Sequence, residues 1–595
     1  MSINRICPIE ERDEEMSNPK LAVQDKLHTP SAGVRLTGGL LKTVFDNNIA
    51  YLKSLSMDSI LYWYRHKSKL PTPGEPFRGF FEDEIKGQAA GLFLMGAGNT
   101  LCWHEDSELR DRVNAIVDSI DRNKESDGYF MAIPKSEFGT GEYPNYVRSW
   151  LTHGLIAAAK VGNEKAMSLV RGMQTWFNRC DERVFAKNLS IGYQGMIANT
   201  NVYLSEVGLP EDLDTAIDCY QENWRLAQFI TGSVKGRDTA VHMRPDEAHG
   251  YELTAIEAYM DLYRITGKPM YLNAVDGAHR LYKKKWQHVG GGIVMIELTE
   301  VYPGCYWLNP AHPYNELCCS VFWIYLNQRY HHLFPDEEHY VAEIEKSIFN
   351  IAVANQKGQE HIRYHAYLDL LKDGHRAPVT CCAGKGTRLY GSLPEFLYSL
   401  APDGVYVDIY ASSELDWDCD GVAVTLHTQT DIPIGNEVRI KVSLSSPRRF
   451  VLKLRIPGWT SSPVEIHLNG EAVATGEPGT YCAVERTWCD GDTVSFALPR
   501  DFVVTRYTGG DALPNFERYA TEYGGLLLGV VGGLEHQGQY IKIDHDPDDP
   551  RSWLTPVPGK PLHFAVKDMP GYEYVPYYEI QDQAFTCYPV FPGNR

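Results

Sequence analysis

Two pairs of adjacent cysteines are the residues of this sequence best suited to chemistry. Cys318 and Cys319 follow Glu316 closely, and Cys381 and Cys382 stand further along the chain. Thiolates and carboxylates are ligands that zinc accepts. Glu316, one cysteine of the first pair and both of the second could therefore bind one Zn²⁺ ion. As an alternative, the first pair are small apolar core residues, since free cysteine is often buried.

Zinc-bound cysteines also offer a route to covalent catalysis on a sugar. A metal keeps thiols deprotonated at neutral pH, and a thiolate beside an anomeric carbon can displace an alcohol to give a thioglycoside. One cysteine would then be both ligand and nucleophile. Coordination lowers nucleophilicity, so the attacking sulfur must be bound loosely or must leave the metal as it attacks.

A retaining glycosidase further needs a carboxyl group about 5 Å from its nucleophile, first as an acid and then as a base. Glu297 and Glu300 precede the Glu316 segment and follow the turn Gly290-Gly291-Gly292. Either glutamate could serve. The alternative for each is an ordinary solvated loop carboxylate.

The elements that must position these residues follow from the spacing of apolar side chains. From about residue 38 to 400 they recur at helical spacing with turn signals between segments, which predicts about a dozen helices in a toroid of paired helices. From about residue 403 the pattern alternates, which predicts antiparallel sheet. We expect a multidomain α + β protein: an (α/α)6-type helical toroid over 1–402, a β-sandwich over 403–500, and over 501–595 a second β-rich domain or completion of the sandwich.

The composition limits the classes of molecule that the protein could bind. The formal net charge of −20 disfavours nucleic acid and anionic lipid surfaces, and no apolar run of about 18 residues could span a bilayer. The first residues show no secretory signal, so we expect a reducing cytoplasm in which the 13 cysteines are free thiols, ligands or nucleophiles. We expect the binding partner to be a small oligosaccharide or glycoside. A homodimer is one alternative for the oligomeric state.

Several motifs resemble the family 127 glycoside hydrolases, whose founding activity is a bacterial β-L-arabinofuranosidase. The likeness covers most of the chain and lies in residues 80–85, 127–129, 289–293, 452–459 and 466–471. It implies a zinc site of Glu316, Cys318, Cys381 and Cys382, with Cys381 as the nucleophile. The family's acid/base precedes the ligand glutamate by about four helical turns of residues, which selects Glu300.

The resemblance also implies sugar contacts. His249, Glu345 and Tyr364 match family positions, and His153 matches less well because the Gly-His order is reversed here. Gln194 stands where the family has a second helical histidine.

The residues after Cys382 also depart from the family's proline-rich segment. A related furanose is therefore an alternative substrate, including one whose carboxyl contacts Lys385 or Arg388. The alternative for these two basic residues is a surface charge at a helix start.

The sequence thus predicts a zinc-dependent, retaining, exo-acting furanosidase. Two alternatives belong to other classes. One is a non-catalytic carbohydrate-binding protein in which four tightly bound ligands make zinc purely structural. The other is an epimerase or uronyl hydrolase on a similar toroid, which needs neither zinc nor a cysteine nucleophile.

Overall fold

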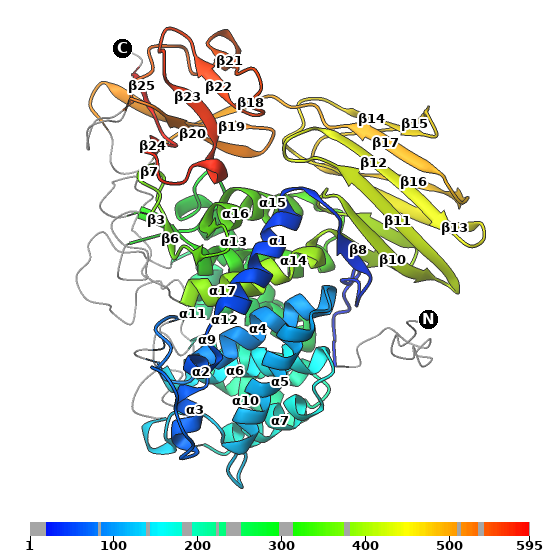
Figure 1. Ribbon diagram of the computed structural model, residues 1–595. Helices are drawn as coiled ribbons and strands as arrows, with labels where there is room; N and C mark the ends of the chain where they lie inside the picture. Colours follow the sequence, from blue (N-terminus) through cyan, green and yellow to red (C-terminus); the bar gives the residue numbers. More distant parts are fainter. Residues whose placement is uncertain are drawn as a thin grey trace.

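The computed structural model describes residues 20–593 except 81, 83–84, 139–142, 181–192, 222–224, 234–251, 297–312, 374–380, 509–512 and 534–540. Helices make up the first part of the described chain, and sheets make up the last part (Figure 1). The predicted order of a helical region followed by antiparallel sheets is confirmed. Among the described residues, no helix has both the length and the apolar character needed to cross a membrane.

Six helices form the inner wall of the helical region. Each packs on the next, and the last packs back on the first, which closes a ring. In order, these are α4 (Gln88–Trp103), α6 (Tyr143–Lys160), α9 (Tyr193–Leu204), α12 (Glu252–Thr266), α14 (Leu317–Leu333) and α17 (Cys381–Gly391).

An outer layer of helices covers this ring, each helix packed on its inner neighbour. Its members are α1 (Gly39–Ser54), α5 (Ser107–Arg122), α7 (Glu164–Asn178), α10 (Pro210–Gln221), α13 (Pro269–Lys285) and α15 (Glu338–Ser347). Shorter helices are α2 (Met57–Ile60), α3 (Tyr62–Lys67), α11 (Arg225–Thr231) and α16 (Val353–Asn355). In α5, Leu109, Val113, Ile116 and Ile120 are buried while the other face is polar, as an outer helix requires.

Glycines let α4 lie unusually close to both of its ring neighbours. A Cβ at Gly154 of α6 would lie 2.4 Å from the carbonyl oxygen of Gly91, and one at Gly384 of α17 would lie 2.7 Å from the Leu92 side chain. Such distances leave no room for a methyl group. The N-terminus of α4 is stabilised by buried Glu82, whose carboxylate accepts the N–H of Ala89 at 2.7 Å.

The sheet region begins with a two-layered β-sandwich. One sheet runs in the order β1 (Val34–Leu36), β10 (Ser413–Cys419), β11 (Val422–Thr430), β12 (Glu437–Leu444), β17 (Thr493–Ala497), β14 (Val464–Leu468) and β15 (Glu471–Gly476). The other runs β16 (Thr480–Trp488), β13 (Arg448–Ile456), β9 (Gly404–Val407) and β8 (Tyr398–Ala401). In this sheet β13 and β9 pair in parallel, which differs from the antiparallel pairing that the sequence predicts. In β12 every second residue is buried, which is the alternation that the sequence shows.

A third sheet follows and has a hydrophobic core of its own. Its main path runs β18 (Phe502–Arg506), β19 (Phe516–Tyr523), β20 (Leu526–Val531), β23 (Glu573–Pro576), β22 (Phe564–Val566) and β21 (Leu554–Pro556). β24 (Phe585–Thr586) and β25 (Val590–Pro592) pair at its side, and β24 also pairs with β7 (Asp369–Leu370) from the helical region. The C-terminal sheet is thereby tied to the segment just before α17.

Short strands in the helical region complete the fold. β2 (Val294–Ile296), β3 (Pro313–Glu316) and β6 (His365–Ala366) form one small sheet, and β4 (Gln356–Lys357) pairs with β5 (His361–Ile362). β3 leads directly into α14.

We expect Gly154→Ala to lower the free energy of unfolding by about 1–3 kcal/mol, because the new methyl group must push α6 away from α4. Gly38→Ala is the matched control, since Gly38 has an extended backbone and its Cβ would have only an ordinary contact at 3.8 Å. Urea unfolding followed by circular dichroism measures both. If the two variants unfolded at the same urea concentration, the close packing of α6 on α4 would be contradicted.

Candidate metal and catalytic centre

Two neighbouring helices of the inner ring bring the predicted ligands together. Glu316 is the last residue of β3 and directly precedes α14, whose first turn contains Cys318. Cys381 and Cys382 are the first two residues of α17. α14 and α17 pack on each other, so both helices start at the same site. The positive end of a helix stabilises a nearby thiolate.

The three sulfur atoms of this cysteine cluster, Cys318, Cys381 and Cys382, lie within 4.8 Å of one another. The Sγ atom of Cys318 lies 3.8 Å from that of Cys381 and 2.7 Å from that of Cys382. An Oε1 atom of Glu316 lies 3.7 Å from the Cys382 sulfur. All four side chains are fully buried.

This donor set fits zinc. A tetrahedral zinc with Zn–S bonds of about 2.3 Å separates two of its sulfurs by about 3.8 Å. The sulfurs of Cys318 and Cys381 have this separation, whereas those of Cys318 and Cys382, at 2.7 Å, would have to move about 1 Å apart to bind the same ion. Three thiols and one carboxylate oxygen also supply the four ligands that a zinc ion prefers. None of these three cysteines forms a disulfide bond, so no disulfide competes for the sulfurs. Cys318, and not its neighbour Cys319, belongs to the group.

Burial makes these thiols poor acids by themselves. Desolvation raises the pKa values of Cys318 and Cys382 well above the ordinary value for a thiol. Without a compensating cation the cysteines would therefore keep their protons at neutral pH. A reactive thiolate in this position needs positive charge close by.

Lys385 provides part of that charge. It lies one turn after Cys381, and its ammonium group packs 4.2 Å from the centre of the Trp150 ring and 5.2 Å from that of Phe322. Burial alone would lower the pKa of Lys385, but the adjacent cysteines and Glu316 raise it overall, so the lysine stays charged. The alternative that Lys385 is a surface charge is wrong, because its side chain is 1% exposed.

Tyr364 lies beside the start of α14. Its carbonyl oxygen accepts the backbone N–H of Leu317 at 3.2 Å, and its ring stacks on His365 at 3.7 Å. His365 pairs with Glu316 across β6 and β3. Burial lowers the pKa of His365 to about 3, so the imidazole is neutral next to the cluster. Sequence reasoning missed His365, although this residue directly follows the predicted sugar contact Tyr364.

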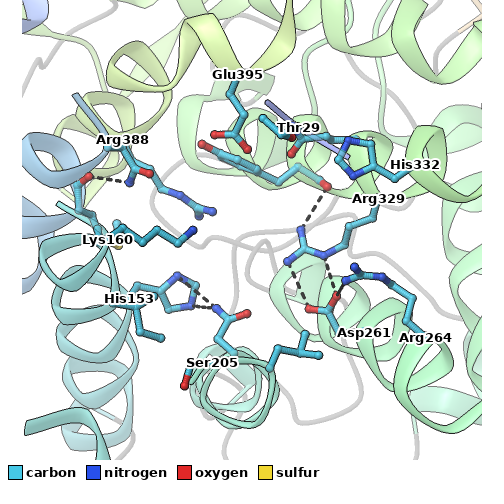
Figure 2. A pocket seen from close by; sticks show the side chains of 18 residues that line it. Thr29, His153, Lys160, Ser205, Asp261, Arg264, Arg329, His332, Arg388 and Glu395 are labelled. Carbon is cyan, nitrogen blue, oxygen red and sulfur yellow. Dashed lines mark hydrogen bonds and ion pairs between the residues drawn. The ribbon is translucent and has the colours of Figure 1, made fainter. Parts of the chain in front are cut away.

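The structure places two predicted sugar contacts away from the cysteine cluster. The carboxylate of Glu345 forms an ion pair with Arg455 at 2.9 Å and accepts the Trp459 indole N–H at 2.8 Å, so it lies between the helical region and the β-sandwich. His153 lies 2.9 Å from the side-chain amide of Asn201 and faces a separate cavity (Figure 2).

The other predicted site residues cannot be compared with the cluster. Glu300, its alternative Glu297, and His249 lie outside the described residues. Gln194 belongs to α9, but its side chain also lies outside the described part of the structure.

Comparison with protein families identifies the family of the chain. Residues 33–395 match the model of the β-L-arabinofuranosidase GH127 catalytic domain, and residues 404–500 match that of the GH127 middle domain. The chain belongs to glycoside hydrolase family 127. It is therefore a glycoside hydrolase of the β-L-arabinofuranosidase type, and a carbohydrate is its substrate.

Solved structures share this fold along their full length. One described as a glycoside hydrolase is 16% identical, with a TM-score of 0.73 over 97% of this chain and 99% of that chain. A GH127 β-arabinofuranosidase is 18% identical, with a TM-score of 0.72 over 96% and 98%. A GH127 β-L-arabinofuranosidase from Geobacillus stearothermophilus T6 is 16% identical, with a TM-score of 0.69 over 94% and 100%. No curated protein sequence matches the chain.

If the cluster binds zinc, Cys382→Ser should lose the ion, because a hydroxyl is a much weaker zinc ligand than a thiolate. Cys319→Ser is the matched control, since Cys319 is an equally buried neighbour of Cys318 outside the group. Elemental analysis of protein purified without chelator should give about one zinc per chain for wild type and Cys319→Ser. Loss of zinc from both variants, or from neither, would contradict the ligand set.

Proposed function

We propose that this protein is a zinc-dependent, retaining, exo-acting furanosidase that cleaves a β-L-arabinofuranoside or a related furanoside. The observation that carries the proposal is the convergence of three buried sulfurs and one carboxylate at the starts of α14 and α17. Glu316, Cys318, Cys381 and Cys382 would hold the zinc ion. When bound, the ion supplies the charge that keeps buried thiols deprotonated.

We assign the attack on the sugar to Cys381, the first residue of α17, because the resemblance to the family implies that this cysteine is the nucleophile. Cys382 already accepts the backbone N–H of Cys318 at 3.2 Å and lies next to Glu316, so its lone pairs point into the protein. Cys381 lies further from Cys318, at 3.8 Å, and opens α17 at its positive end.

In the first step, a lone pair of the Cys381 sulfur forms a bond to the anomeric carbon while the bond from that carbon to the leaving oxygen breaks. Glu300 gives its proton to the leaving oxygen. In the second step, Glu300 takes a proton from water, the water oxygen bonds to the anomeric carbon, and the carbon–sulfur bond breaks. Two inversions give net retention, and both groups return to their starting states. Lys385 keeps positive charge behind the departing thiolate.

One observation favours a second candidate, a non-catalytic protein in which zinc only stabilises the fold. The four donor side chains are all fully buried, as they are in closed structural zinc sites. In that case removal of zinc would lower the melting temperature, and no aryl furanoside would be hydrolysed.

Replacing the nucleophile tests the proposal directly. We expect Cys381→Ser to reduce kcat on an aryl β-L-arabinofuranoside by about 10⁴-fold or more, because a buried hydroxyl is a far weaker nucleophile than a thiolate. Cys319→Ser should retain activity. Circular dichroism should show that both variants are folded. Full activity of Cys381→Ser on every cleavable furanoside would exclude the mechanism.

Glu300→Gln provides the complementary test. With an activated aryl leaving group the first step needs no acid, so the covalent sugar adduct should accumulate on Cys381, because water is no longer activated. Peptide mass spectrometry identifies the modified residue. An adduct on another residue would assign the nucleophile elsewhere.

Lys385→Met should move the acidic limb of the kcat/KM profile to higher pH, by about one unit, because loss of an adjacent positive charge makes thiolate formation harder. Arg449→Met is the control, since Arg449 is an exposed residue of the β-sandwich paired with Glu485. An unchanged limb in Lys385→Met would show that Lys385 does not act on the sulfur.

A further inference from the structure

A cavity of about 400 Å³ lies inside the ring of helices (Figure 2). Residues of α4, α6, α9, α12, α14 and α17 line it, together with Thr29, Ser205 and Glu395. On α17 the lining residue is Arg388, seven positions after Cys381, which is about 10 Å along a helix axis. On α14 the lining residues start at Tyr325, two turns after Cys318. The cavity therefore lies toward the opposite ends of the helices that carry the sulfurs.

A packed layer separates this cavity from the cysteine cluster. Trp150 and Phe322 stack with ring centroids 6.1 Å apart, and the ammonium group of Lys385 lies against both rings. Neither these three residues nor any of the clustered cysteines lines the cavity. A ligand bound here would be distinct from the sugar attacked by Cys381.

The charges on the cavity wall are unevenly paired. Arg264 and Arg329 share Asp261, at 2.8 and 3.1 Å. Arg264 also pairs with Asp25, and Arg329 also pairs with Glu257 at 2.8 Å. Lys160 and Arg388 differ, because in the described part of the chain no carboxylate oxygen lies within 4.0 Å of either. Their charged groups reach toward the middle of the cavity from one side, opposite the paired arginines (Figure 2).

The neighbours of these two cations suit a small polar molecule. Arg388 is held flat by the Tyr325 ring, with 3.8 Å between the guanidinium carbon and the ring centre. His153 and Asn201 offer hydrogen-bonding groups on the adjacent wall. Burial and then the charges of Arg388, Arg329 and Lys160 keep the pKa of His153 well below its usual value. This wall therefore carries two cations and a neutral imidazole, and Glu395 adds one carboxylate to the lining of the cavity.

We propose that this cavity binds a small organic anion of about monosaccharide size, with its carboxylate or phosphate group between Lys160 and Arg388. The volume lies within the range of ordinary small-molecule sites. An oxyanion would give both cations the charged partner that they lack in the described structure, and arginine and lysine are the residues that bind carboxylate and phosphate. This assignment does not depend on which sugar the cysteine site cleaves.

Isothermal titration calorimetry of the full-length protein tests the proposal with three probes: D-glucuronate, D-glucose 6-phosphate and neutral D-glucose. We expect at least one of the charged sugars to bind, and D-glucose to bind at least about tenfold more weakly. The probe that binds more tightly shows whether the site prefers carboxylate or phosphate. Failure of both charged sugars to bind, or equal binding of D-glucose, would overturn the proposal.

Charge-neutral variants locate the binding site. Lys160→Gln and Arg388→Gln should each weaken binding of the charged sugar by about tenfold or more. Lys160 lies at the exposed end of α6, so its replacement should leave the fold intact. Lys165→Gln and Arg449→Gln are matched controls, because both residues are exposed and paired at the surface. Unchanged affinity in Lys160→Gln and Arg388→Gln would overturn the proposal even if wild type binds the probes.

Discussion

The burial of three thiols and a carboxylate at one point inside the helical ring is the constraint on which the rest of this structure depends. Each of these groups is acidic, and each is withdrawn from water. Desolvation favours the neutral forms, whereas metal binding and nucleophilic attack require thiolates. Thiolates at this position are therefore stable only if positive charge lies close to them. The buried Lys385 and the starts of α14 and α17 supply part of that charge, and a zinc ion would supply the remainder.

Such a site must also be rigid, because a metal or catalytic site needs its side chains held within about 0.5 Å of the productive geometry. The glycine contacts between α4 and its neighbours serve this purpose. Gly384 lies between Cys382 and Arg388 and lets α17 rest against Leu92, while Gly96 of α4 leaves room for Thr387. The helix that carries two of the sulfurs is thus fixed along its length against the largely buried α4. The third sheet adds a further restraint through β7 and β24, just before α17.

Much of this arrangement was predictable from the sequence, and the limits have physical reasons. Apolar periodicity predicted helices followed by sheets, because it records which face of each element is buried. The cysteine pairs predicted the cluster because zinc chemistry restricts ligand types. Neighbouring residues on a helix point about 100° apart, so the sequence could not tell Cys318 from Cys319. The sequence also could not show that Glu345 contacts Arg455, because these two residues are 110 positions apart in the chain. The contact of His153 with Asn201 was hidden for the same reason.

The same two helices connect the cysteine cluster to the cavity lined by Arg388. α14 and α17 present sulfurs at their first turns and Tyr325 and Arg388 two turns later. Between these levels, Lys385 is charged yet fully enclosed by Trp150 and Phe322. Because a charge in a low-dielectric interior acts over several ångströms in every direction, Lys385 raises the potential at the sulfurs and also at His153. A change of charge at Arg388 therefore also changes the electrostatic potential at the cysteine cluster. The electrostatic potentials of the two sites are coupled.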